Sequence, residues 1–309
     1  MRVLYLGMLG EFSRLPLAQL LDANVDVCGV VVPGEKSAGD PPINLLPPQE
    51  RVTSLPLLTP YRALNIVHLA WEHGIPAFEL NRLSHPGSLA TLAQLQPDVA
   101  AVACFSRRIP APLLALPPHG FLNLHPSRLP DYRGPEPIFW QLRDGVNPLG
   151  VTLHVMDEGL DTGDVVGQTA VSLPDGASRH TIDALAAAAG ADLLLTALQN
   201  LAQGVLPCQS QLATEGSYQP LPQAADFQLD VGWSARRAFN FMRGTAEYGW
   251  PYSLLIEGRQ LRMTEALAYE PDGVLERGVV GNGREAHIQF SPGILHTRLQ
   301  APIWQEQTE

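Results

Sequence analysis

Short apolar runs alternate with amphipathic stretches through the first 200 residues of the chain. Apolar runs of strand length stand at residues 2–6, 25–32, 97–105, 121–124, 151–156 and 165–171. Stretches with helical spacing of their apolar positions, the last of them rich in alanine and leucine, lie at residues 12–21, 61–73, 86–95 and 177–202. This alternation predicts the α/β fold class, with a mainly parallel sheet covered by helices on both faces. Residues 33–60, rich in proline and glycine, are expected to form a long loop.

The pattern changes after Gly204. Residues 207–222 are rich in glutamine, proline and serine, which is typical of a linker. A short helix is expected at residues 234–243, and strand-like pieces alternate with turn signals at residues 252–256, 260–267, 278–281 and 286–290. The turn signals are Glu257-Gly258, Asp272-Gly273 and Asn282-Gly283. We therefore predict an α/β domain at residues 1–204, a linker at 205–224 and a small β-barrel-like domain at 225–309.

The composition narrows the possible partners. The chain of 309 residues carries a net charge of −11, and Lys36 is its only lysine. Such an acidic chain is a poor match to a polyanion, because affinity for nucleic acid depends on neutralised phosphates. The three cysteines are far apart and odd in number, and the nine histidines lack paired-ligand spacing, so we expect free thiols and no metal. The start of the chain does not resemble an export signal, so we expect a cytoplasmic protein without a membrane segment.

The densest polar chemistry lies between residues 121 and 168. Asn123 and His125 alternate along a predicted strand and therefore point to the same face. Asp161 lies in an acidic, glycine-containing turn after another strand. An asparagine that donates to an oxyanion, a histidine that shuttles a proton and an aspartate that holds the histidine would suit acyl transfer. The alternative is that these three are ordinary turn and surface residues.

Gly7 and Gly10 stand where a nucleotide-binding fingerprint would begin. The segment lacks the G-x-G-x-x-G spacing, so a tight turn from strand to helix is the simpler interpretation. A nucleotide-dependent dehydrogenase is kept only as an alternative that follows from the fold class.

The stretch from Phe121 to Gln168 resembles the folate-dependent formyltransferase family, which includes methionyl-tRNA formyltransferase and the sugar-nucleotide N-formyltransferases. The resemblance rests on an Asn-x-His pair, a Ser-x-Leu-Pro loop written SRLP, a Tyr-Arg-Gly and an Asp-x-Gly-x-Asp-x-Gly-Asp turn, all in order. A weaker likeness extends over residues 1–202, and AFNFMRG and YGWPYSLL resemble the small appended barrel of these branches. The resemblance implies a Rossmann-like first domain and transfer of a formyl group from N10-formyltetrahydrofolate to a primary amine, without a metal.

The resemblance also implies roles for individual residues. The catalytic residues would be Asn123, His125 and Asp161. The folate would be held mainly by backbone groups at Phe105, Ser106, Arg107, Arg108, Ile109, Met156, Asp157, Glu158 and Asp161. The acceptor would meet Ser127, Leu129, Pro130, Arg133 and Gly134.

The identity of the amine is argued from charge. Residues 205–309 contain eight arginines and twelve acidic residues, and the segment 34–50, where the family's tRNA-contacting loop would fall, has one lysine and three acids. Both features favour a small amine, such as an amino sugar on a nucleotide, over methionyl-tRNA. Methionyl-tRNA stays the first alternative. A hydrolase of formyl-folate or a non-catalytic folate-binding relative is the second, and the oligomeric state is open.

Overall fold

The structure is a computed structural model that describes residues 1–35, 39–48, 65–212 and 215–303. Its chain packs into two compact units. The first contains residues 1–135, 150–171 and 183–218, and the second contains residues 136–149, 172–182 and 219–309. Which segments fold independently stays a prediction.

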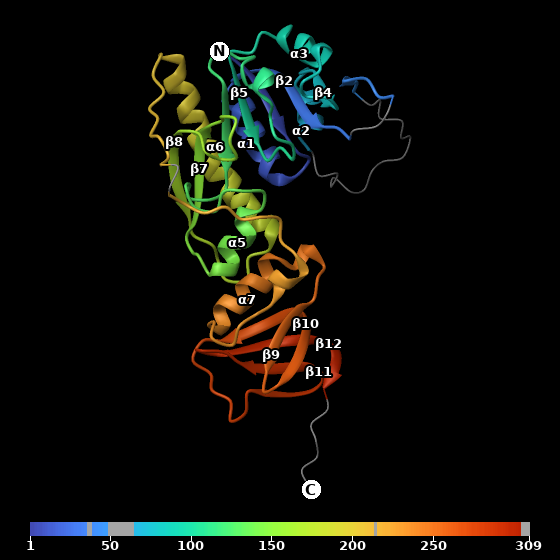
Figure 1. Ribbon diagram of the computed structural model, residues 1–309, viewed down its shortest axis with the longest axis vertical. Helices are drawn as coiled ribbons and strands as arrows, with labels where there is room; N and C mark the ends of the chain where they lie inside the picture. Colours follow the sequence, from blue (N-terminus) through green and yellow to red (C-terminus); the bar gives the residue numbers. More distant parts are fainter. Residues whose placement is uncertain (36–38, 49–64, 213–214, 304–309) are drawn as a thin grey trace. The chain divides into compact units, whose positions relative to one another are not determined.

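The first unit is built on an eight-stranded sheet with the order β3-β4-β2-β1-β5-β6-β7-β8 (Figure 1). The strands are β1 (Arg2–Gly7), β2 (Asp26–Pro33), β3 (Ile43–Leu46), β4 (Ala77–Leu80), β5 (Val99–Ala103), β6 (Phe121–His125), β7 (Leu149–Val155) and β8 (Val165–Val171). The five strands from β4 to β6 run parallel, whereas β3 and β7 are antiparallel to their neighbours β4 and β6. The central strands β1 and β5 are buried and read as continuous apolar runs, as expected of strands covered on both faces.

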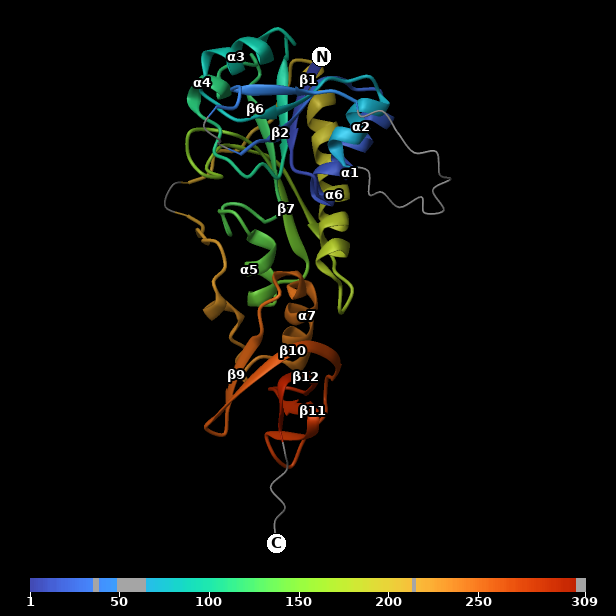
Figure 2. The same ribbon diagram turned by 90° about the vertical axis from the view of Figure 1, so that its right-hand side faces the viewer.

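Helices pack on both sides of this sheet. They are α1 (Glu11–Asp22), α2 (Ile66–Glu72), α3 (Pro86–Ala93), α4 (Ala111–Leu114) and α6 (Arg179–Ala202), whose first residues belong to the second unit. Figure 2 shows α1, α2 and α6 together on one side of the sheet. Asn65 begins α2 by accepting hydrogen bonds from the backbone N–H groups of Val67 and His68. The α/β fold class predicted from the alternation of apolar runs is confirmed.

Helix α6 is the only described helix that is long and apolar enough to cross a membrane by length and composition alone. Its apolar residues recur at helical spacing on a buried stripe that includes Ala187, Ala191, Leu194 and Leu198. This pattern is that of a helix packed against a protein core.

One short strand, β3, corrects the expectation of an unbroken loop at residues 33–60. Strand β3 pairs with β4, a second strand that was not predicted from the sequence. Both strands have only four residues, which is too short for a clear alternation of apolar and polar positions. Residues 36–38 and 49–60 of the predicted loop, and residues 61–64 of the predicted helix, lie outside the described residues.

The second unit contains a four-stranded antiparallel sheet with the order β11-β12-β10-β9. Its elements are α5 (Pro137–Asp144), the 3-10 helices η1 (Ala224–Phe227) and η2 (Ala246–Tyr248), α7 (Ala235–Gly244), β9 (Tyr252–Ile256), β10 (Arg259–Glu270), β11 (Val279–Gln289) and β12 (Ile294–Ile303). The predicted turn at Asn282-Gly283 is wrong, because both residues lie within β11. Gly283 has a φ of +67° there, and the pairing with β12 shifts register beside it.

Aromatic side chains form much of the core of the second unit. Phe139 from α5 contacts Phe227, Phe241 and Tyr248, with ring centroids 5.2 to 5.5 Å apart. Tyr252 is buried in the same cluster, and its hydroxyl donates to the carbonyl of Met242 at 2.9 Å. Helix α5 was not predicted from the sequence. Its apolar residues nonetheless anchor this core.

Candidate active site

Strand β6 presents Asn123 and His125 on the same face of the sheet. The antiparallel neighbour β7 places His154 directly opposite Asn123, and Thr152 opposite His125. Directly opposed residues of an antiparallel pair share a face and are close enough to interact. The Asn123 Nδ2 atom accordingly lies 3.0 Å from His154 Nε2.

Asp161 reaches the same place from the turn that follows β7. Its Oδ1 atom lies 3.7 Å from His125 Nδ1 and 3.6 Å from His154 Nε2. Its Oδ2 atom accepts a hydrogen bond of 2.9 Å from the backbone N–H of Gly134. The structure therefore brings the three predicted catalytic side chains together, and their catalytic roles stay predictions.

The turn that carries Asp161 is tightly constrained. Asp161 has a φ of +56°, a left-handed backbone that is uncommon for a residue other than glycine. A Cβ atom added to Gly163 would lie 1.8 Å from the carbonyl oxygen of Val155 on β7. The glycine therefore allows the turn to pass close to the strand, and this approach holds Asp161 over the histidines.

His125 is almost completely buried, with 4% of its surface exposed. Its Nε2 atom lies 2.9 Å from the carbonyl oxygen of Tyr132, which assigns a proton to Nε2 and directs Nδ1 toward Asp161. Burial lowers the pKa of His125, and His154 lowers it further, while Asp161 and the Tyr132 carbonyl act in the opposite direction. The balance favours a neutral imidazole near neutral pH.

Asp161 is charged under the same conditions. Burial alone would raise the pKa of its carboxyl, but the positive charge of His125 and His154 in their protonated forms and the hydrogen bond from the Gly134 N–H together lower it to about 2. The site therefore combines a carboxylate, a neutral histidine and an amide donor in a buried place.

His154 was not among the residues predicted from the sequence. It is 1% exposed, and its Nδ1 atom lies 2.9 Å from the carbonyl oxygen of Val155, which assigns the proton to Nδ1. The Nε2 atom is then an acceptor, and it receives an N–H of Asn123. The signal was present in the sequence, since Thr152 and His154 alternate along β7 as Asn123 and His125 do along β6.

The two segments predicted to hold folate lie next to each other. The guanidinium of Arg108 donates to the carbonyl oxygen of Glu158, and the side chains of Phe105 and Met156 pack against the same hydrophobic cluster. Asp157 accepts hydrogen bonds from Gly159 N and the Thr162 hydroxyl within its own turn.

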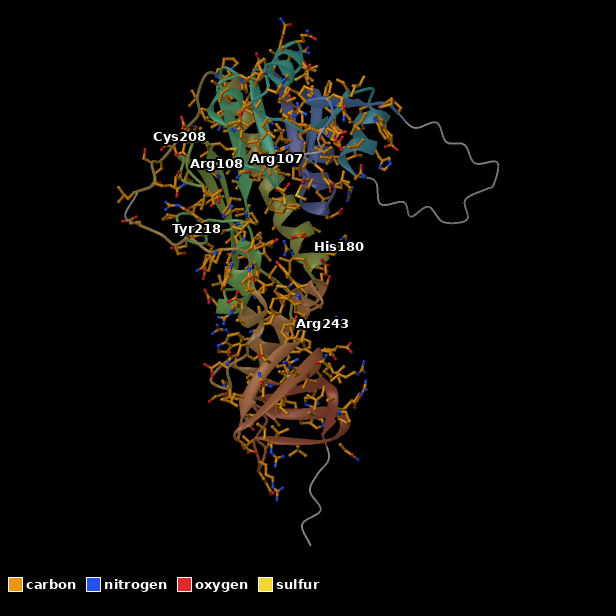
Figure 3. All side chains as sticks on the ribbon, turned by 45° about the vertical axis from the view of Figure 1, so that its right-hand side comes forward. Arg107, Arg108, His180, Cys208, Tyr218 and Arg243 are labelled. Atoms are coloured by element: carbon orange, nitrogen blue, oxygen red, sulfur yellow. The ribbon has the colours of Figure 1, made fainter. Side chains whose placement is uncertain are left out.

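The other residues of the first folate segment differ in exposure. Ile109 is buried and Ser106 is exposed. Arg107 and Arg108 (Figure 3) are neighbours in the chain, but their side chains have different partners. Arg107 donates to the carbonyls of Leu80 and Asn81, each at 2.9 Å, and so connects its loop to the end of β4.

The predicted acceptor residues occupy a loop that is mostly closed by its own hydrogen bonds. Ser127 is fully buried and donates to the carbonyl of Asp131 at 2.7 Å. Leu129 is 3% exposed, and its N–H donates to the Thr152 hydroxyl at 3.1 Å. Pro130, Arg133 and Gly134 continue the loop toward Asp161. Within the described residues, no group of three or more His, Cys, Asp or Glu side chains is arranged to hold a metal ion.

The family model for formyl transferase matches residues 30–198, which include the whole of this site. The chain belongs to the folate-dependent formyltransferase family. Methionyl-tRNA formyltransferase from Pelotomaculum thermopropionicum is 32% identical over 93% of this chain and 86% of the relative. The family makes this chain an enzyme that transfers a formyl group.

Two solved structures share the fold of this formyltransferase. The N-formyltransferase from Helicobacter canadensis, in complex with folinic acid and dTDP-3-aminofucose, has a TM-score of 0.64 and 15% identity over 98% of this chain and all of that chain. HypX from Aquifex aeolicus, in complex with tetrahydrofolic acid, has a TM-score of 0.57 and 17% identity, and the match covers 96% of this chain and 43% of HypX.

Proposed function

We propose that this formyltransferase moves the formyl group of N10-formyltetrahydrofolate to the primary amine of a small molecule, such as an amino sugar on a nucleotide. The supporting observation is the buried group of Asn123, His125, Asp161 and His154 beside two segments joined by the bond from Arg108. We place the reaction in the cytoplasm.

In the proposed reaction, these side chains move one proton from the acceptor nitrogen to N10 of the folate. The acceptor nitrogen attacks the formyl carbon, and the electrons of the C=O bond move to its oxygen. The free N–H of Asn123 stabilises that oxyanion, since its other N–H is held by His154. Neutral His125 takes the proton from the attacking nitrogen through Nδ1, and the carboxylate of Asp161, 3.7 Å away, stabilises the resulting imidazolium. As the bond from carbon to N10 of the folate breaks, the imidazolium of His125 gives its proton to N10, and His125 is neutral again.

The charge of the second unit supports a small acceptor. Several of its arginines are already engaged by carboxylates, because Arg236 pairs with Asp175 at 2.8 Å and Arg298 pairs with Glu265 at 2.7 Å. A carboxylate that holds an arginine competes with the phosphates that a tRNA would bring. The low positive charge of segment 34–50 also favours a small acceptor. Residues 36–38 and 49–50 of that segment lie outside the described residues.

Methionyl-tRNA is the second candidate acceptor. It is favoured by the likeness to the Pelotomaculum thermopropionicum enzyme, which extends over 93% of this chain and therefore includes most of the second unit. The two candidates differ in their expected response to salt, because binding of tRNA weakens steeply as the salt concentration rises and binding of a small nucleotide sugar changes less.

Tetrahydrofolate formation from N10-formyltetrahydrofolate tests the proposal. The purified protein is given dTDP-3-aminofucose and methionyl-tRNA separately, with His125→Ala as the control. We expect turnover with the amino sugar nucleotide that His125→Ala lowers by about 10² or more.

Each other outcome changes the conclusion. Turnover with methionyl-tRNA alone would make methionyl-tRNA the acceptor in place of the amino sugar nucleotide. Formyl release without any amine, still dependent on His125, indicates a hydrolase. Absence of turnover together with absence of 5-formyltetrahydrofolate binding overturns the proposed function.

A further inference from the structure

The segment of residues 208–218 lies against the candidate active site, although its composition predicted a linker. We call its described residues, 208–212 and 215–218, the strap. Cys208 and Tyr218, labelled in Figure 3, mark its two ends. Near the first end, Gln209 and Val165 exchange backbone hydrogen bonds of 2.8 Å at the start of β8.

The second end of the strap holds the loop next to His125. The N–H of Tyr132 donates to the Ser217 hydroxyl at 2.9 Å, and the N–H of Arg133 donates to the Ser217 carbonyl at 2.9 Å. The carbonyl of Tyr132 is the group that faces His125 Nε2. Gly216 passes so close to this loop that an added Cβ atom would lie 2.1 Å from the carbonyl oxygen of Pro130.

Gln211 joins the strap to both sides of the site. Its Nε2 atom donates to the carbonyl oxygens of Asp161 at 3.0 Å and Gly163 at 2.6 Å. Its Oε1 atom accepts from Arg133 Nη2 at 2.8 Å. Because the amide donates on one side and accepts on the other, only one orientation of the side chain satisfies all three bonds.

These bonds close a ring. Gln211 binds Arg133, the next residue Gly134 donates to the carboxylate of Asp161, and the carbonyl of Asp161 returns to Gln211. The ring encloses the one residue of the candidate catalytic group whose backbone is left-handed. A strained backbone persists where its surroundings over-determine it, and Gln211 supplies part of that surrounding.

We propose that Gln211 is a positioning residue that holds Asp161 at the distance from which its carboxylate supports His125. It acts through Asp161 and touches neither folate nor acceptor in this role. The role of Asp161 in the reaction rests on the proposed function. The placement of Asp161 by Gln211 rests on the geometry alone.

Gln211→Met is the informative variant, because methionine has nearly the length of glutamine and makes none of the three bonds. Gln209→Met is its matched control on the same strap, since Gln209 is exposed and is held through its backbone. The first readout is the pKa of His125. It is measured by an NMR titration of the imidazole in the full chain, with no substrate present. We expect Gln211→Met to lower that pKa further, because a displaced Asp161 supports the imidazolium less.

The second readout is turnover with the acceptor that the wild type uses. We expect kcat to fall about 10- to 100-fold in Gln211→Met, with the dissociation constant of 5-formyltetrahydrofolate unchanged within about twofold, because a displacement near 1 Å in a catalytic group has effects of that size. In an Asp161→Asn background, adding Gln211→Met should cost nothing more. Gln209→Met should match the wild type in both readouts.

Two results would overturn the inference. One is an unchanged titration of His125 in Gln211→Met. The other is an equal further loss of kcat when Gln211→Met is added to Asp161→Asn, which would show that Gln211 acts elsewhere. If Gln211→Met does not fold, Gln211→Glu keeps the bond to Arg133 while it opposes the two carbonyls, and the same readouts apply. Failure of the proposed function would leave the titration result intact, so the two failures are distinguishable.

Discussion

Asp161 should make the stability of the protein depend on pH in the acid range. Its pKa lies at about 2 in the folded chain, against an ordinary value of 3.8. The folded state therefore favours the carboxylate, and this stabilisation is fully present above the ordinary pKa and lost as the pH falls toward 2. At about 1.4 kcal/mol for each pKa unit, the contribution is about 2 kcal/mol at pH 6 and about half of that at pH 3.

Asp161→Asn removes this titration while it keeps the size of the side chain and an oxygen for the N–H of Gly134. The free energy of unfolding is measured with urea at pH 3, 4, 5 and 6, using circular dichroism. We expect the gap between wild type and variant to shrink by about 1 kcal/mol from pH 6 to pH 3. Asp157→Asn is the matched control, because it makes the same change of charge in the same turn at an exposed carboxylate.

A gap that stays constant over this pH range would refute the assignment of this stabilisation to Asp161. The assignment would also be refuted if Asp157→Asn showed the same shrinking gap, because the effect would then belong to the overall charge of the turn.

Substitutions at three further positions test other parts of the structure. In His154→Gln the side-chain oxygen can replace Nε2 as an acceptor, so kcat should stay within about tenfold of the wild type. His154→Leu should lower kcat about 10²-fold or more, because Asn123 loses its orientation. Equal rates for the two variants in steady-state assays would contradict this. Gly163→Ala should abolish turnover and lower the free energy of unfolding by about 1 to 3 kcal/mol, since the added Cβ meets a backbone oxygen; a fully active variant would exclude the constraint. Tyr252→Phe removes a buried hydroxyl with two hydrogen bonds and should cost about 1 to 2 kcal/mol in thermal unfolding while leaving kcat unchanged; an unchanged melting temperature would speak against it.

The architecture of the first unit was predictable because its long strands carry strong patterns. Strands β1 and β5 are buried on both faces and therefore appear in the sequence as unbroken apolar runs. The edge strand β3 and its neighbour β4 were missed, since four residues carry almost no periodicity. A different limit applies to β11, where Asn282-Gly283 has the composition of a turn but pairing with β12 keeps it in the strand.

The candidate site was predictable where neighbouring residues along the chain share a face, as Asn123 and His125 do. His154 was not found, because its place opposite Asn123 depends on the register between two strands separated by about 25 residues of chain. Arg107 was predicted to bind folate, yet its guanidinium donates to backbone carbonyls of this chain. Pairings of this kind depend on tertiary contacts that no local pattern encodes.

The strap changes where this protein can be divided. A shortened chain that ended at Gly204, where the composition changes, would retain Asn123, His125, His154 and Asp161. It would nonetheless lose every hydrogen bond that Gln211 and Ser217 make to the loops around them. A version of the first unit prepared for separate study therefore has to extend through Tyr218, and swaps of the second unit between relatives should be joined after that residue.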